Sequence, residues 1–391
     1  MHNPLKTTPL GLRAALWALC ILAAGGLTFS QGCDGDGDDK PDGAVDAGDV
    51  GGDGDASGDC PAPEAVTDLL PESLACVGLY TDVAKQTVAP GVRSFAPAYK
   101  LWSDGAQKAR WILMPEGTAI DGTDPDDWKF PPLTRLFKEF SWKGHRVETR
   151  VFWKVSQGRW LKAAYHWNAD ETAATRFDGG EVDVAGDTYE IPSGKMCDQC
   201  HKGRTDRALG FEPVLLGLPG AEGITLKSLV DDGLLDNYSG PTELSIGDDG
   251  TGVGAEVLPW LHVNCGVSCH NDFPASEAAK TDMRMRLRAE ELDGSATGGL
   301  DTRTTNIDMA ASTRRWADWT RIVAGNPDES LLYFLVTTRD DANDKDRMPP
   351  IGSRIVPTDA AAMLDTWIRA MVPTPPDGDL DGGTPDADAG I

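Results

Sequence analysis

The sequence has little positive charge. It contains 36 Lys and Arg against 62 Asp and Glu, which gives a formal net charge of -26 at pH 7. Residues 34–59 contain ten Asp and one Lys and residues 377–391 five Asp, so these stretches carry -14 of the total and the rest is still acidic. This argues against a protein that binds nucleic acid or anionic lipid through charge.

The same two regions also have few apolar side chains. They consist mostly of Asp, Gly, Ala and Ser, and such stretches cannot bury enough apolar surface to offset the entropy of ordering. We therefore expect a disordered linker over 34–59, which would act as a flexible tether, and a disordered acidic tail over 374–391.

Long hydrophobic runs are missing as well. The segment LWALCILAAGGL follows Lys6 and Arg13 and is too short for a confident membrane span, so residues 1–33 are typical of a signal peptide. The run ends in FSQGC, where Gly32-Cys33 resembles a bacterial lipoprotein site. We expect an exported protein, on the periplasmic side or cell surface, anchored to a membrane through a lipid on Cys33; cleavage near Ala24 is the alternative.

Eight cysteines divide by position. Cys20 would leave with the signal peptide, and Cys33 is the candidate for the lipid. Cys60 and Cys76 bracket a short segment in an oxidising compartment, which predicts a disulfide worth about 3 kcal/mol. The other four cysteines form two pairs, each followed by a histidine.

Residues 60–190 have the pattern of an antiparallel β domain. In Arg146–Val155, Val151 and Trp153 fall on one face and Arg150 and Lys154 on the other, with Phe152 as an exception. The domain is rich in tryptophan. These indoles would line a ligand site or, as we favour, pack in the core.

After Ile191 the period becomes helical. Helices are predicted for Thr225–Leu235, for the segment EVLPWLHVN, for the run after Pro327 and for the segment after Pro357, where Leu364, Trp367, Ile368 and Met371 form one stripe.

The first cysteine pair, Cys197-Asp-Gln-Cys200-His201, has the spacing that attaches haem c covalently. Two thiols form thioethers with the haem vinyl groups and the next histidine binds iron. A zinc site and a redox dithiol are the rival interpretations.

The second pair, Cys265-Gly-Val-Ser-Cys269-His270, has one residue more between its thiols. Cys269 still precedes His270 directly, and Gly266 can take the backbone geometry that a small bulge needs. Met348-Pro349-Pro350 follows downstream, before the last predicted helix.

Together with LWSDGAQKARWILMPEG, VETRVFWKV and RMPPIGS, these motifs resemble an uncharacterised family of exported bacterial dihaem c-type cytochromes, and the C-terminal part resembles class I cytochrome c. The resemblance implies an α+β chain: a β domain (60–190), a first haem segment (191–255) and a mainly α-helical cytochrome c-like domain (256–373). It implies two covalent haems, one on Cys197, Cys200 and His201 and one on Cys265, Cys269, His270 and Met348.

The first haem lacks an evident sixth ligand, because no Met lies between His201 and Cys265. His145 and His166 are candidates from the β domain, although each is more simply a surface or packed histidine. Met196 adjoins the motif too closely to reach the far face, and His262 is most simply a solvated helix residue.

These features predict single-electron transfer between exported redox proteins. A peroxidase-type haem enzyme with an open first iron is the alternative, although no distal acid-base set is evident. A haem-free zinc or ligand-binding module is the second alternative.

Overall fold

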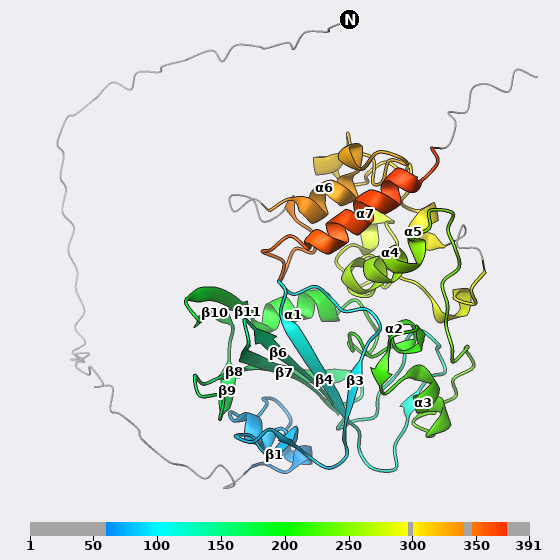
Figure 1. Ribbon diagram of the computed structural model, residues 1–391. Coiled ribbons are helices and arrows are strands. Elements are labelled where there is room, and N and C mark those ends of the chain that lie inside the picture. Colours follow the sequence, from blue (N-terminus) through cyan, green and yellow to red (C-terminus); the bar gives the residue numbers. More distant parts are fainter. Residues whose placement is uncertain (1–59, 296–299, 340–345, 374–391) are drawn as a thin grey trace, which may run out of the picture. The chain divides into compact units, whose positions relative to one another are not determined.

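In the computed structural model, residues 60–295, 300–339 and 346–373 are described. Their main feature is a seven-stranded antiparallel sheet (Figure 1). In spatial order its strands are β12 (Glu222–Gly223), β3 (Val92–Ala96), β4 (Gln107–Leu113), β6 (Arg135–Trp142), β7 (His145–Ser156), β8 (Arg159–Trp167) and β9 (Ala174–Phe177). The antiparallel β pattern predicted for residues 60–190 is confirmed.

One face of the sheet packs against the N-terminal segment of the described chain. Its apolar side chains alternate along the strands as expected for a strand period of two. The buried members are Val66, Leu70, Leu74, Val77, Leu79, Tyr80, Phe137, Val151, Trp153, Tyr165, Trp167 and Ala174. The predicted disulfide between Cys60 and Cys76 is present and ties the start of this segment to its middle.

Short strands and helices complete the described chain. The minor strands are β1 (Tyr80–Asp82), β2 (Thr87–Val88), β5 (Ile120–Asp121), β10 (Gly180–Val184), β11 (Asp187–Ile191) and β13 (Leu235–Asp236). The α-helices are α1 (Gly194–His201), α2 (Pro213–Gly217), α3 (Leu226–Asp231), α4 (Gly254–Leu261), α5 (Asp301–Thr304), α6 (Leu331–Thr337) and α7 (Thr358–Ala370).

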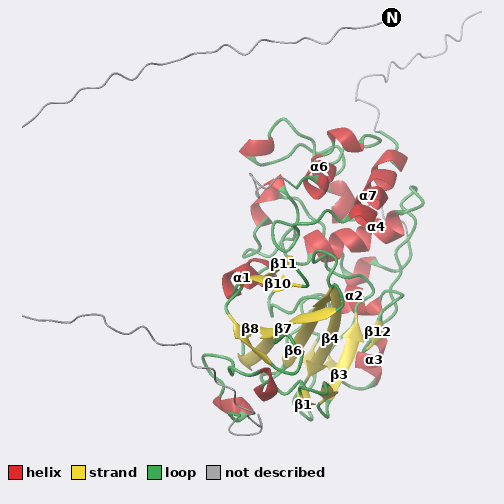
Figure 2. Ribbon diagram, turned by 60° about the vertical axis from the view of Figure 1, so that its left-hand side comes forward, coloured by secondary structure: helices red, strands yellow, loops and turns green. Residues whose placement is uncertain are grey.

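The expectation of a mainly α-helical, cytochrome c-like haem region after residue 190 is wrong. Of the described helices only α7 exceeds eight residues, and long loops join them (Figure 2). These loops are held by side chains instead of a helical ladder: the buried Arg321 guanidinium donates to the carbonyls of Thr281, Asp282, Thr305 and Ala310. Buried Asn306 likewise donates to the carbonyls of Arg284 and Thr302, so backbone groups that a helix would satisfy find partners here.

The helix predictions differ in their outcome. The predicted stripe of α7 is confirmed, since Leu364, Trp367, Ile368 and Met371 are all buried. The helix predicted over Thr225–Leu235 is only α3, because Gly233 has φ +66° and turns the chain toward β13.

One hydrophobic cluster runs from the second face of the sheet into the helices. It joins Ile112 and Phe152 of the sheet to Leu258 of α4 and to Trp367 of α7. The sheet and the segments that carry both cysteine motifs are therefore packed around a shared core.

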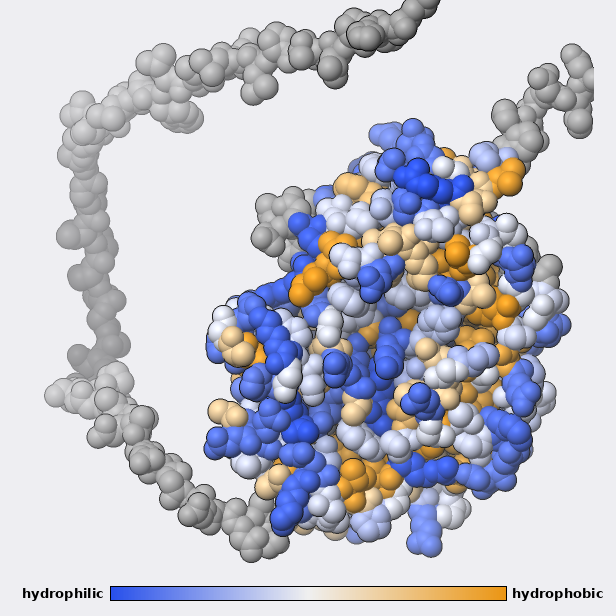
Figure 3. Space-filling model, viewed as in Figure 1, coloured by the Kyte–Doolittle hydropathy of each residue, from blue (hydrophilic) through white to orange (hydrophobic). Residues whose placement is uncertain are grey.

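Apolar residues on the surface are scattered among hydrophilic ones in the view of Figure 3. The exposed large hydrophobic residues are Leu69, Val88, Met309, Ile355 and Val372. Within the described ranges, no helix is long and apolar enough to cross a bilayer. The predicted signal peptide, lipid site at Cys33, acidic linker and acidic tail all lie outside the described residues.

A buried ion pair joins β7 to the chain that follows α1. The Lys154 ammonium donates to Asp206 at 2.5 Å and to the Phe130 carbonyl at 2.6 Å, and Asp206 also accepts from the Trp160 indole at 2.8 Å. Only 1% of the Lys154 side chain is exposed, so water cannot take the place of Asp206 or the Phe130 carbonyl as its partner.

We predict that Lys154→Met lowers the free energy of unfolding by about 3–5 kcal/mol, because it leaves the Asp206 charge buried without a cation. Urea unfolding measures the loss. The double variant Lys154→Met/Asp206→Asn should recover part of the stability, and Lys85→Met, which removes an exposed lysine paired with Asp82, should have no measurable effect. Equal losses in the single and double variants would contradict the ion-pair explanation.

Candidate functional site

The first cysteine motif lies on α1. The Ser193 hydroxyl accepts a hydrogen bond from Met196 N at 3.4 Å and caps the helix, which places Cys197 near its middle and Cys200 and His201 at its end. Residues three apart share a helix face, so both thiols lie on one side of α1 with the histidine directly after them. Burial raises the pKa of Cys197, and it raises the pKa of Cys200 to about 11.

His201 is held as an iron ligand would be. Its Nδ1 donates to the Arg207 carbonyl at 2.6 Å, which fixes the tautomer and leaves the Nε2 lone pair free. Burial, together with the positive charges of Lys138 and Arg150, lowers the pKa of His201 to about 3, so the ring is neutral. The imidazole stacks on Phe152 of β7 with 3.9 Å between ring centroids.

A cavity, referred to below as the α1 cavity, borders this motif. The open space along it is about 1340 Å³, with the mouth and the adjoining solvent included. Helix α1 contributes Met196, Cys197, Cys200 and His201. The facing walls are aromatic and basic, and they come from β4, β6, β7, β11 and two loops: Trp102, Lys108, Lys138, Phe140, Trp142, Arg150, Phe152, Tyr189, Arg354 and Ile355.

The second cysteine motif begins in a π-helical turn. Helix α4 continues into His262–Gly266 with i to i+5 bonds: Val267 N donates to the His262 carbonyl at 2.8 Å, and His270 N to the Cys265 carbonyl at 2.8 Å. A π-turn holds one residue more than an α-turn. The extra residue between Cys265 and Cys269 is therefore accommodated in the helix.

His270 and its cysteines are deeply packed. Burial lowers the pKa of His270 to about 4 and raises the pKa values of Cys265 and Cys269 to about 12. The Met283 backbone opposes the fall in the pKa of His270, but no hydrogen bond of good geometry reaches its buried Nδ1. The larger cavities of the described chain do not border Cys265, Cys269 or His270, so the second motif has a haem ligand set without matching space around it.

The two motifs lie against each other. A side chain at Gly203, two residues after His201, would overlap the Ser268 carbonyl of the second motif. Asn271 Nδ2 donates to the Gly203 carbonyl at 3.3 Å and to the Gly266 carbonyl at 2.8 Å. Cys200 is close enough to Cys269 that a thiolate there raises the pKa of Cys269.

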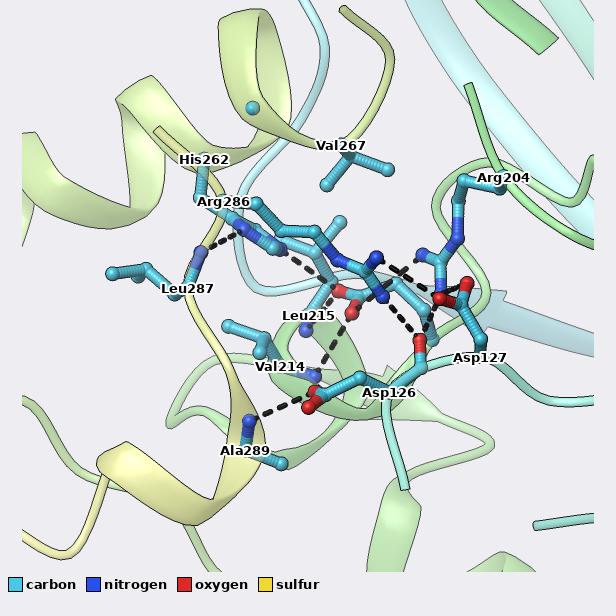
Figure 4. Close-up of polar contacts among 12 residues, drawn as sticks. Asp126, Asp127, Arg204, Val214, Leu215, His262, Val267, Arg286, Leu287 and Ala289 are labelled. Carbon is cyan, nitrogen blue, oxygen red and sulfur yellow. Dashed lines mark hydrogen bonds and ion pairs between the residues drawn. The ribbon is translucent and has the colours of Figure 1, made fainter. Parts of the chain in front are cut away.

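A buried ion cluster, the Arg204–Arg286 cluster, links both motifs to the loop after β5 (Figure 4). Arg286 donates to Asp127 at 3.1 Å and to the Asp126 carbonyl at 2.5 Å. Arg204 donates to the same Asp126 carbonyl and lies 3.9 Å from Glu212, and both arginines are about 95% buried. Arg204 follows the first motif and Arg286 follows the second. The acidic turn at Asp126 and Asp127 binds both arginines and so connects the two motifs.

The expectation that His262 is a solvated helix residue is wrong. Its side chain is fully buried, and both ring nitrogens have partners. Nδ1 accepts from Leu287 N at 2.9 Å (Figure 4), and Nε2 contacts Glu212 at 3.3 Å. Burial alone would raise the pKa of Glu212, but His262 and Arg204 lower it to about 2. Glu212 also caps α2 by accepting from Leu215 N at 2.7 Å.

The remaining candidates do not line the α1 cavity, except Met196. His145 is exposed and lies 3.6 Å from Glu171, and His166 packs on Phe177. Met348 follows α6, with its amide bonded to the Leu335 carbonyl at 2.8 Å. The loop just after Met348, at residues 351–355, does reach the α1 cavity.

The tryptophans lie in two kinds of environment. Trp128, Trp153, Trp160 and Trp167 are buried in the core, whereas Trp102 and Trp142 line the α1 cavity.

No group of three or more His, Cys, Asp or Glu side chains converges as a metal site within the described residues. Comparison with known proteins adds no assignment: no family model matches the chain, and no curated protein or solved structure is significantly similar to it.

We predict that Gly266→Ala destabilises the fold, because its Cβ would overlap the Met285 carbonyl and the Arg286 amide of the segment that crosses the motif. Overpacking of this kind costs about 1–3 kcal/mol. The matched control is Gly194→Ala, where a Cβ meets nothing within 4 Å and the first turn of α1 gains helix propensity. Thermal unfolding of both variants is the measurement, and equal midpoints would contradict the close approach.

The lowered pKa of Glu212 predicts acid sensitivity. A carboxyl with a folded pKa of about 2 and an ordinary value of 4.5 contributes stability above pH 4.5 that is lost as the pH falls toward 2. The stability of the wild type should exceed that of Glu212→Gln at pH 6, and the difference should shrink through that interval. Glu243→Gln, at an exposed glutamate, should follow the wild type throughout. A difference that is constant with pH would show that Glu212 acts only as a neutral cap.

Proposed function

We propose that this chain is an exported c-type cytochrome that transfers single electrons between redox partners. The observation that carries the proposal is the geometry at the first motif. There a neutral His201, its tautomer fixed by the Arg207 carbonyl, follows two thiols on the wall of a cavity lined by aromatic and basic side chains. Tetrahedral zinc would need four converging donors, which the described residues do not assemble.

The residues of the first motif have separate tasks in this proposal. Haem supplies the one-electron couple when it is bound. Cys197 and Cys200 tether it, and His201 offers Nε2 to the iron. Phe152 holds the imidazole plane by stacking, while Trp102 and Trp142 exclude water from the cavity.

A second haem would be held by Cys265, Cys269, His270 and Met348. The π-turn supports this assignment because it explains how an extra residue fits between the thiols. Against it stands the close packing at Cys265, which must open to admit a porphyrin. The contact between Gly203 and Ser268 would hold the two attachment motifs against each other.

The partners proposed are exported redox proteins. The acidic chain would steer toward a basic partner, with an on-rate that falls as salt is added. A lipid on Cys33 would keep this exchange at a bacterial membrane.

A second candidate is a haem enzyme of peroxidase type with an open first iron. One observation favours it: His145 and His166, the candidates for the sixth ligand, do not line the α1 cavity. Low-spin spectra at both haems would count against this candidate, and a shift on adding cyanide would support it.

We predict two covalent haems per chain in protein matured by a c-type system. A pyridine haemochrome assay counts the haems and the band position reports the thioethers. Cys197→Ser/Cys200→Ser should remove one haem and Cys265→Ser/Cys269→Ser the other, whereas Cys60→Ser/Cys76→Ser should retain two. One haem in the wild type would restrict the cytochrome to the motif that still binds it, and none would refute the proposal.

A further inference from the structure

Three cations form a row across the centre of the sheet. Arg110 of β4 lies opposite Lys138 of β6, and Lys138 lies opposite Arg150 of β7. Like charges directly opposite one another on adjacent strands are unfavourable. A fold that keeps this cation row, Arg110, Lys138 and Arg150, must gain something that offsets the repulsion.

The described protein does not supply enough anions to neutralise the row. Arg150 pairs with Glu148 through bonds of 2.8 and 2.5 Å, but Arg110 has only a 3.5 Å contact with the Lys108 carbonyl and its Nε has no partner. Within the described ranges, the Lys138 side chain has no hydrogen bond or ion pair. Burial and the two arginines lower the pKa of Lys138 to about 7.

The row faces the attachment site. Lys138 and Arg150 line the α1 cavity together with Cys197, Cys200 and His201. Arg110 lines the small adjoining cavity, of which Lys138 is also a wall. An anion that enters from the α1 side therefore meets the row at Lys138.

Other charged groups on these walls are already paired. Glu190 of β11 lies 3.1 Å from Arg354, and Asp104 accepts from Ile355 N at 2.8 Å. Lys108 of β4 donates to the Leu101 carbonyl, and the Tyr189 hydroxyl donates to Glu148 at 3.0 Å. Lys108, Lys138 and Arg110 therefore have no carboxylate partner in the described protein, and of these only Lys108 has a close hydrogen bond.

We propose that the cation row binds the two propionate carboxylates of the haem attached at Cys197 and Cys200. A porphyrin tethered through its vinyl positions carries its propionates on another edge, and Lys138 and Arg150 are walls of the same cavity as the thiols. Carboxylates would remove the repulsion within the row and restore an anionic partner to each unpaired cation. This inference rests on the proposed attachment of haem at the first motif.

The test uses matured protein whose haem propionates carry a ¹³C label, so that redox-difference infrared spectra report the carboxylates themselves. Lys138→Gln and Arg110→Gln should shift labelled bands, because each loses a charged partner. Lys138→Arg keeps the charge and should retain the wild-type positions. Lys85→Gln, at a lysine whose side chain is 80% exposed on another part of the chain, should change nothing.

The haem count by pyridine haemochrome in the same samples separates the two proposals. If haem is absent at the first motif, the proposed function fails first. If haem is present and the labelled bands of Lys138→Gln and Arg110→Gln match the wild type, the inference on the propionates is overturned alone. Unchanged bands combined with a succinate-induced shift of the visible spectrum, lost in Lys138→Gln, would likewise overturn it and assign the row to a free carboxylate.

Discussion

The position of both cysteine motifs depends on the buried Arg204–Arg286 cluster. Two guanidinium groups taken out of water cost several kcal/mol each unless anions and carbonyls replace the lost hydration. The turn at Asp126 and Asp127 supplies those groups to both arginines at once. Because each arginine follows a different motif, the electrostatic requirement of one turn brings the motifs together against the sheet.

Partners that are distant in the sequence also explain what the sequence could and could not predict. Alternation along β7 correctly assigned Val151 and Trp153 to one face, and the spacing of Cys60 and Cys76 correctly predicted their disulfide. Alternation does not reveal what covers the opposite face. That face is covered by later segments, with Tyr189 of β11 bonded to Glu148 and Asp206 bonded to Lys154, so both residues are almost fully buried although they belong to the polar side of the pattern. His262 was misjudged for the same reason, since its partner Glu212 lies 50 residues away in the chain.

The irregular C-terminal part shows a second limit of sequence periodicity. A helical region was expected because its motif order resembles class I cytochrome c, and the order of motifs contains no information about the segments between them. Arg321 and Asn306 organise those segments by bonding carbonyls distant in sequence, which leaves no periodic signal. The π-turn at Cys265 is different, because an added residue between otherwise ordinary attachment positions is a local signal for such a turn.

The cation row also bears on the direction of electron flow in the proposed cytochrome. A thioether ligand such as Met348 favours Fe(II) and would by itself give the second haem the higher potential. Positive charge beside the first haem favours its reduced form too, while ion-paired propionates cancel part of that effect. The iron ligands alone therefore do not determine which of the two proposed haems has the higher reduction potential. The balance between Lys138, Arg110 and the propionates would contribute as well, because a low-dielectric wall screens these charges little.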